Sequence, residues 1–250
     1  MRYSLDKKEQ IEIDFWEKSQ YESPAHFSIQ NLNNKLQECE NLAYKLQKYQ
    51  AYIQGKKDVL EIGAGQGWAS CFMKSKFLPE AKFTVTDISQ FAVKSVKYWE
   101  AHFEVKISKA FAAKSYTIEE PDDSFDLIFC YAAAHHFVLV KETLIELKRL
   151  LKKDGRIIFI YEPTCSKLLY PLFYRYVNSI PHSTPEDVLV PSRIKKICQS
   201  IDLIYENHYD PTVIIDRNKR TTQYFKILGA VPFLQKVLPS SSDLIFYNNQ

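Results

Sequence analysis

The chain has 250 residues, of which 46% are hydrophobic and 25% are charged, and this balance is typical of a globular protein with a sizeable core. The formal net charge is +3 and the basic residues lie in short separate clusters, so specific nucleic-acid binding is not favoured. Five cysteines at long spacing, without a C-x-x-C pair, argue against a disulfide framework and against a metal site of the zinc type.

The sequence favours a cytoplasmic protein. Its first ten residues contain no apolar core of the secretory kind. The longest uncharged run covers residues 127–140, which is too short to cross a bilayer and indicates a buried strand that continues into a loop. We therefore expect a reducing compartment and no stable membrane insertion, and the oligomeric state is left open.

Residues 1–55 are predicted to form a mostly helical N-terminal segment. Apolar residues recur at three- and four-residue spacing, as on one face of an amphipathic helix, and Gly55 predicts the end of that helix. The apolar stripe consists of Leu36, Cys39, Ala43, Leu46, Tyr49 and Ile53.

Residues 56–162 are predicted to form the core of an α/β fold. Strands that alternate with helices of about ten to fifteen residues indicate a mostly parallel sheet, and right-handed crossovers place helices on both of its faces. The amphipathic helix over 141–154 is expected to end just before Gly155. The expected strands are 58–63, 82–89, 104–111, 124–134 and 156–163, and the other expected helices are 68–78 and 90–103.

Residues 163–250 are predicted to hold cap insertions and the last strands of the same domain. The stretch 164–192 is rich in Tyr, Pro, Leu and Phe and breaks the strand–helix rhythm. It is the core of an insertion, a lid that makes an apolar pocket, or both. An interfacial membrane contact is a weaker alternative, because the stretch has little basic flanking. The remaining expectations are a helix over 192–201, a strand over 202–210, a cap-like segment over 221–239 and a strand over 242–249.

A glycine-rich turn follows the first expected strand in the sequence EIGAGQGW. Gly63, Gly65 and Gly67 are half of the six glycines in the chain, and a residue without a Cβ lets a ligand approach the backbone. A dinucleotide-binding turn needs G-x-G-x-x-G. Its third glycine would be residue 68, which is Trp68, so the pattern argues against a nicotinamide-dependent oxidoreductase. No Lys-Ser/Thr pair follows, which argues against a P-loop.

Two acidic residues flank this turn. Glu61 precedes the first glycine by two residues, and Asp87 ends the second expected strand, where a carboxylate can accept hydrogen bonds from both hydroxyls of a ribose. Acidic residues without a phosphate-binding pattern suit a ligand that combines a ribose with positive charge. S-adenosylmethionine is such a ligand.

The chain resembles the class I S-adenosylmethionine-dependent methyltransferases over roughly residues 55–162. The matching segments, in the family's order, are VLEIGAGQG, VTDIS, DDSFDLIFCYAAAHHF and LKRLLKKDGRIIFIYEP. The resemblance implies a three-layer Rossmann-like fold with a seven-stranded, mostly parallel sheet whose last strand is antiparallel. N-terminal helices and a helical cap after the fifth strand complete the expected architecture.

The resemblance also implies a set of cofactor-binding residues. Asp87 would bind the ribose hydroxyls and Ile88 would lie against the adenine. Many relatives place an Asp about a dozen residues before the fourth strand for the adenine amino group, but this chain has none there, so Ser115 or a backbone carbonyl is a substitute. The full expected set is Glu61, Gly63, Ala64, Gly65, Gly67, Asp87, Ile88, Ser115, Cys130 and Tyr131.

The expected acceptor side follows the fourth and fifth strands. His135 and His136 are candidate catalytic residues, with His136 favoured, because imidazole can take a proton from an acceptor near neutral pH. The alternative is a structural role beside the cofactor loop. Tyr161 and Glu162 could enter the substrate cleft, although Glu162 could equally be a solvated turn residue. His26 could reach the cleft from the N-terminal segment, with helix capping or packing as its alternative.

The sequence thus predicts a methyltransferase that modifies oxygen or nitrogen of a small-molecule acceptor such as a sugar, glycan precursor, lipid or natural product. A non-catalytic S-adenosylmethionine-binding protein is one alternative, and an RNA methyltransferase is another. The Asn/Asp-Pro-Pro-Tyr/Phe run of amino-methylating nucleic-acid enzymes is replaced by residues 131–134, Tyr-Ala-Ala-Ala.

Overall fold

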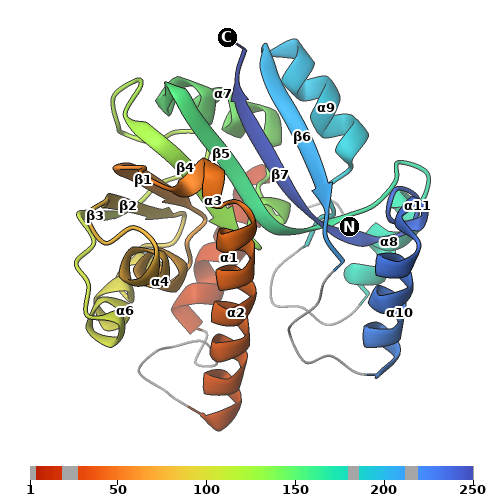
Figure 1. Ribbon diagram of the computed structural model, residues 1–250, viewed down its shortest axis with the longest axis horizontal. Coiled ribbons are helices and arrows are strands. Elements are labelled where there is room, and N and C mark those ends of the chain that lie inside the picture. Colours follow the sequence, from red (N-terminus) through yellow and green to blue (C-terminus); the bar gives the residue numbers. More distant parts are fainter. Residues whose placement is uncertain (1–3, 19–27, 180–185, 212–218, 250) are drawn as a thin grey trace.

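The computed structural model describes residues 4–18, 28–179, 186–211 and 219–249. A seven-stranded sheet runs through the molecule in the order β3-β2-β1-β4-β5-β7-β6 (Figure 1). β7 is antiparallel to both of its neighbours, and the other pairings are parallel. The predicted fold class is therefore confirmed. The strands are β1 Asp58–Ile62, β2 Lys82–Asp87, β3 Lys109–Ala112, β4 Phe125–Tyr131, β5 Leu151–Thr164, β6 Leu203–Tyr209 and β7 Ser240–Asn248.

Helices cover both faces of the sheet because successive strand residues point to opposite sides. Val59 joins the core beneath one helical layer, whereas Leu60 joins the core beneath the other. The first layer contains α2 Ile29–Lys48, α3 Gln50–Ile53, α4 Trp68–Lys76 and α6 Val96–Phe103, and the second contains α7 Val140–Leu150 and α9 Pro191–Ser200. The remaining helices are α1 Leu5–Lys18, α5 Gln90–Val93, α8 Tyr170–Val177, α10 Lys219–Ala230 and α11 Pro232–Gln235, with a 3-10 turn η1 over Ala134–His136.

Several predicted elements have different bounds in the structure. The helix expected over 141–154 ends at Leu150, because Leu151 already pairs with Phe125 of β4 and is fully buried. A register shift after this pair lets β5 continue to Thr164 with Gly155 inside the strand. The strand expected over 104–111 is confined to Lys109–Ala112. The boundaries of the three predicted segments stay predictions.

Only the C-terminal half of the predicted stripe on α2 is buried. Leu46 and Tyr49 pack into the core, together with Ile53 of α3, whereas Leu36 is 55% exposed. A fully buried polar residue, Lys45, lies beside this stripe. The N-terminal helix is therefore held by charge as well as by apolar contact.

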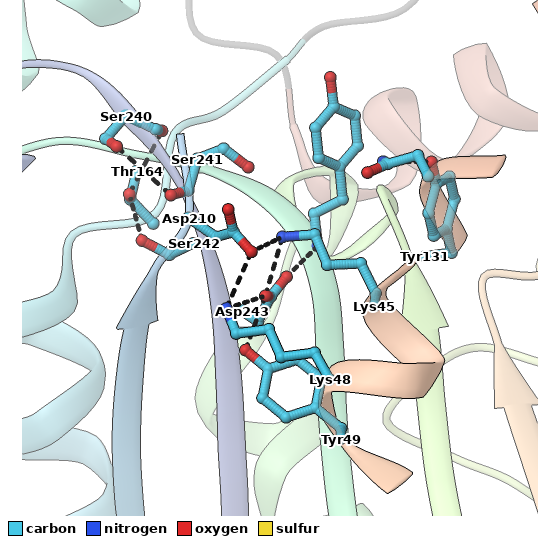
Figure 2. A network of polar contacts seen from close by, with 12 residues as sticks. Lys45, Lys48, Tyr49, Tyr131, Thr164, Asp210, Ser240, Ser241, Ser242 and Asp243 are labelled. Atoms are coloured by element: carbon cyan, nitrogen blue, oxygen red, sulfur yellow. Dashed lines mark hydrogen bonds and ion pairs between the residues drawn. The ribbon is translucent and has the colours of Figure 1, made fainter. Parts of the chain in front are cut away.

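Lys45 is the centre of a polar network that joins α2 to the far edge of the sheet (Figure 2). Its Nζ lies 2.9 Å from Oδ2 of Asp243 in β7 and 2.9 Å from Oδ2 of Asp210 after β6. Lys48 Nζ lies 2.8 Å from Asp210, and the Tyr49 hydroxyl donates to Asp243 at 2.7 Å. Asp243 Oδ1 accepts from the backbone N–H of Tyr161 at 3.0 Å. One buried carboxylate thus joins α2, β7 and the end of β5.

Replacement of Lys45 by methionine is expected to lower the free energy of unfolding by about 3 kcal/mol, because it leaves buried carboxylates with incomplete compensation. Urea denaturation followed by circular dichroism would measure the loss. The control is Lys48→Met at a side chain that is 31% exposed, and its expected loss is below about 1 kcal/mol. Equal losses for the two variants would contradict a dominant role for Lys45.

Candidate functional site

A cavity of about 390 Å³ lies at the carboxyl ends of β1, β2, β3 and β4. In an open α/β sheet this is the edge at which ligands bind. Nine predicted site residues line it, namely Gly63, Ala64, Gly65, Asp87, Ile88, Ser115, Tyr131, His135 and His136. Five others are absent from the lining, namely Glu61, Gly67, Cys130, Tyr161 and Glu162. The predicted substrate residue His26 lies outside the described residues.

The glycine turn brings backbone N–H groups to this cavity. Gly65 has a φ of +52°, and its N–H donates to Asp87 Oδ2 at 2.8 Å. A Cβ at this position would lie 2.9 Å from Cζ2 of Trp16. At Gly67, where φ is +75°, a Cβ would lie 2.8 Å from Val96. The absence of a side chain at Gly65 therefore leaves room for Trp16 at the cavity surface, whereas its absence at Gly67 allows α4 to pack closely against its neighbours.

Asp87 is held at the end of β2 by two backbone donors. In addition to Gly65, the N–H of Ser89 donates to Oδ1 at 2.9 Å. Burial raises the pKa of this carboxyl to about 6, although the two N–H groups act in the opposite direction. Each carboxylate oxygen keeps a second lone pair. The ionised group can therefore accept further hydrogen bonds from a ligand in the cavity.

Glu61 lies behind the turn. Its carboxyl group is buried and accepts from the Ser70 N–H at 3.1 Å, in the first turn of α4. Burial raises its pKa to about 8, even though hydrogen bonds from Ser70 lower it. Its position supports the helix that follows the glycine turn, and its predicted contact with a cofactor stays a prediction.

Ser115 and Tyr131 line the cavity with part of their hydrogen-bonding capacity already used. The Ser115 hydroxyl lies 2.8 Å from the Thr143 hydroxyl, and the Tyr131 hydroxyl accepts from Asn41 at 2.8 Å. Cys130 is fully buried, and its Sγ lies 3.7 Å from Glu162. Direct cofactor contact by Cys130 is therefore the least supported of the predicted contacts.

Glu162 organises the loop after β4. Its fully buried carboxylate accepts from the N–H groups of Ala133 and Ala134, each at 2.9 Å, and of His135 at 3.2 Å. Its Oε2 also lies 2.9 Å from His135 Nδ1. The alternative of a solvated turn residue is wrong, because the strand register shifts between Phe159 and Glu162 and the carboxylate is enclosed beneath this loop.

Comparisons with known proteins agree with this arrangement. The family model of a methyltransferase domain matches residues 60–159. The chain is 32% identical over 120 residues to the uncharacterized methyltransferase YcgJ of Bacillus subtilis, and this match covers 44% of the chain and 42% of YcgJ. The chain carries a class I S-adenosylmethionine-dependent methyltransferase domain.

Solved structures extend the likeness of the fold beyond residues 60–159 to most of the chain. The YcgJ crystal structure has a TM-score of 0.61 at 17% identity, over 84% of this chain and 99% of YcgJ. A phosphoethanolamine N-methyltransferase of Haemonchus contortus, in complex with phosphomonomethylethanolamine and S-adenosylhomocysteine, has a TM-score of 0.58 at 15% identity, over 84% of this chain and 52% of that one. At these identities the likeness shows the fold alone.

The cavity of the methyltransferase domain fits S-adenosylmethionine. Asp87 presents a carboxylate to the cavity, where it could accept hydrogen bonds from ribose hydroxyls, beside a turn of which Gly63 and Gly65 line the space. Carboxylates outnumber ammonium groups in the lining, which suits a cofactor with a sulfonium and an α-ammonium group. The carboxylates belong to Glu9, Glu12, Glu38, Asp87, Glu186 and Asp187, and the ammonium groups belong to Lys8, Lys35 and Lys114.

The two histidines of the cavity differ in their surroundings. Burial alone would lower the pKa of His135. The hydrogen bond and the negative charge of Glu162 raise this pKa by a larger amount, so the net change is an increase. The ring of His136 lies 4.2 Å from that of His135, and its Nδ1 lies 3.7 Å from Oε2 of Glu12. His135 is thus a paired, buried group, and His136 is the better candidate for proton transfer.

Helix α1 lines one side of the cavity. Glu9 lies 2.7 Å from Lys114 Nζ and accepts a hydrogen bond from the Tyr116 hydroxyl, both in the segment after β3. Trp16 packs on Gly65, and Glu12 faces His136. Sequence analysis missed these contributions from α1, because its acidic and aromatic residues form no recognisable motif and meet the cavity only in three dimensions.

The affinity of the protein for S-adenosylmethionine is expected to fall by roughly fivefold to tenfold between pH 7 and pH 5. Ionised Asp87 would accept hydrogen bonds from the ribose hydroxyls, and acidification through its pKa of about 6 protonates it in the free protein. Calorimetric titration across this range would measure the change. Asp87→Asn should bind more weakly and show a flat profile. Parallel profiles for wild type and variant would assign the pH dependence to another group.

No helix within the described ranges is long and apolar enough to cross a membrane. All five cysteines, which belong to that part of the chain, carry free thiols.

Proposed function

We propose that the chain is an active methyltransferase that transfers the methyl group of S-adenosylmethionine to nitrogen or oxygen of a small-molecule acceptor. The observation that carries this proposal is the position of helix α1 along one side of the cavity. Helix α1 is fastened across it through Glu9 and Trp16, so the space beside His136 suits a small acceptor better than a polymer. A cytoplasmic location is part of the proposal and is supported by the free thiols.

When bound, S-adenosylmethionine supplies a methyl group that its sulfonium already activates. The chain contributes binding, orientation and exclusion of water, which accelerate a displacement by fixing the reactants in line. Asp87 and the glycine turn would hold the adenosine. Glu162 keeps the loop after β4 in place, and α1 limits the access of water to the cavity. His136 would accept a proton from the acceptor, with Glu12 stabilising the charged imidazole.

Nitrogen is the favoured acceptor atom. The excess of carboxylates in the lining, including Glu12 and Glu186, attracts a protonated amine. The solved phosphoethanolamine N-methyltransferase is a structural relative crystallised with an amine. An oxygen acceptor would need the same proton transfer to His136, so it stays within the proposal.

The test combines binding with turnover. Calorimetry should detect S-adenosylmethionine at micromolar to millimolar concentration, and Asp87→Ala should weaken binding by roughly 100-fold, as expected for two lost charge-assisted hydrogen bonds. A panel of amines, alcohols and RNA, assayed with labelled methyl groups, then identifies the acceptor class. Tight binding without transfer to any acceptor would support a non-catalytic cofactor-binding protein. Methylation of RNA alone would replace the small-molecule assignment.

A further inference from the structure

The corner between α10 and α11 exposes apolar residues to solvent. Phe233 is 69% exposed and Ile227 is 56% exposed, with Val231 between them also exposed. Residues 229–233, Gly-Ala-Val-Pro-Phe, form a continuous exposed apolar run. We call residues 226–236 the apolar corner. Contiguous exposed apolar surface on a folded helix pair marks a contact site.

The apolar corner is held in shape by internal contacts. Gln235 Nε2 donates to the Leu228 carbonyl at 2.7 Å, and both side chains are buried. The Tyr224 hydroxyl donates to the Pro239 carbonyl at 2.5 Å, at the start of β7. Phe233 is therefore presented by a fixed corner.

Helix α8 adds a second exposed apolar face. Leu168, Leu172 and Tyr176 recur every four residues and are exposed, while the opposite side of the helix packs on Val188 and Val190. Thr164, shortly before α8, pairs with Ser240, shortly after α11. The two surfaces therefore leave the sheet at the same end, where Figure 1 draws α8, α10 and α11.

Within the two segments that carry these surfaces, every charged residue is basic, and the carboxylates of Glu186 and Asp187 beside α8 line the cavity. The sequence contains no Asp or Glu over residues 163–185 or over residues 217–242. The next carboxylate after the second stretch, Asp243, is fully buried and paired with Lys45. Lys226 and Lys236 are the first and last residues of the apolar corner and are exposed, Arg175 lies in α8, and Lys167 lies just before it. The C-terminal helices thus supply the basic flanking that the aromatic stretch lacks by itself.

We propose that α8 and the apolar corner form a docking surface for a membrane that contains anionic lipids. Exposed apolar side chains enter the boundary between headgroups and acyl chains, while nearby lysines and arginines are attracted to anionic headgroups. Membrane binding by this combination of contacts is peripheral and reversible. The surface also continues into the cavity wall, because the Tyr170 hydroxyl of α8 donates to Asp187, a lining residue, at 2.9 Å. Docking would bring the cavity close to amphiphilic molecules in the bilayer.

The test measures binding of the full chain to vesicles by co-sedimentation. Vesicles of phosphatidylcholine mixed with phosphatidylglycerol should bind the protein, vesicles of phosphatidylcholine alone should bind it at least roughly tenfold more weakly, and salt should reduce the binding. Val231→Ser/Phe233→Ser should lower the partition coefficient by roughly tenfold or more. Lys226→Glu/Lys236→Glu should also lower it by at least roughly tenfold.

The matched control is Tyr98→Ser/Ile145→Ser, which removes two exposed apolar side chains from α6 and α7. It should bind vesicles as the wild type does, and thermal unfolding should show that each variant is folded. Equal binding to both vesicle types would overturn the proposal, as would wild-type binding by the corner variant. A concentration-dependent dimer that only the corner variant abolishes would instead assign the surface to a second copy. None of these outcomes depends on methyl transfer.

Discussion

Replacement of His136 by alanine is expected to lower kcat by roughly 10²-fold to 10⁴-fold, the usual contribution of a general base. The side chain lines the cavity beside the loop after β4, and Glu12 lies close enough to stabilise its protonated form. Affinity for S-adenosylmethionine should change by less than about threefold, because the imidazole is proposed to act on the acceptor. Single-turnover assays with a saturating acceptor, together with calorimetry, would separate the two quantities.

The pH profile gives this experiment a second readout. Wild-type turnover should increase with pH until the base is deprotonated, whereas the alanine variant should lose that limb of the profile. Glu12→Gln should shift the limb to lower pH, since it removes a negative charge that favours the imidazolium. Turnover above half of the wild-type value in the alanine variant would place His136 in a purely structural role.

Replacement of Glu162 by alanine is expected to lower the free energy of unfolding by about 3–5 kcal/mol. The change removes the acceptor of three buried backbone N–H groups and the partner of His135. Turnover should fall as well, because the loop that carries His136 loses its anchor. Urea denaturation would measure stability, and a folded population at low temperature would be assayed for activity.

Glu162→Gln tests the charge of this anchor. It keeps an oxygen acceptor but lets burial dominate at His135, so the pKa of His135 should fall in a nuclear magnetic resonance titration. In the wild type the raised pKa of His135 contributes stability at low pH that is lost as pH increases through that pKa. The control is Glu206→Ala, which removes a more exposed Glu–His pair. In that pair Glu206 Oε2 lies 3.0 Å from His208 Nε2, a distance similar to that between Glu162 and His135. The expected loss of unfolding free energy for Glu206→Ala is below about 1 kcal/mol. A loss equal to that of Glu162→Ala would contradict the role of Glu162 as an anchor.

The predictions that succeeded rest on local sequence patterns. The alternation of strands and helices predicted the parallel core of the sheet, and the glycine turn with Asp87 predicted the edge of the sheet at which the cavity lies. The errors lie where tertiary contacts compete with local preference. Residues 151–153 continue the amphipathic pattern of α7, yet Leu151 joins β5 because it pairs with Phe125 and fills the core.

Glu162 shows why the acceptor side was harder to predict. A Glu before Pro163 has the same local sequence whether it is solvated or buried. Four of its donors come from residues 133–135, and only the pairing of β4 with β5 and the register shift near Tyr161 bring them together. The roles of Glu9, Glu12 and Trp16 depend in the same way on where α1 packs.

The sequence by itself determined the order of the strands and helices, the glycine turn and its acidic partner. The reason is that the periodicity of apolar residues and the backbone freedom of glycine are local properties. Only the tertiary structure decided which charges are buried and paired, such as Lys45 with Asp243, and which apolar residues stay exposed, such as Phe233. Burial and pairing depend on segments far apart in the chain. For the same reason, the covering of the cavity by α1 and the basic surroundings of the apolar corner became evident only in the folded protein.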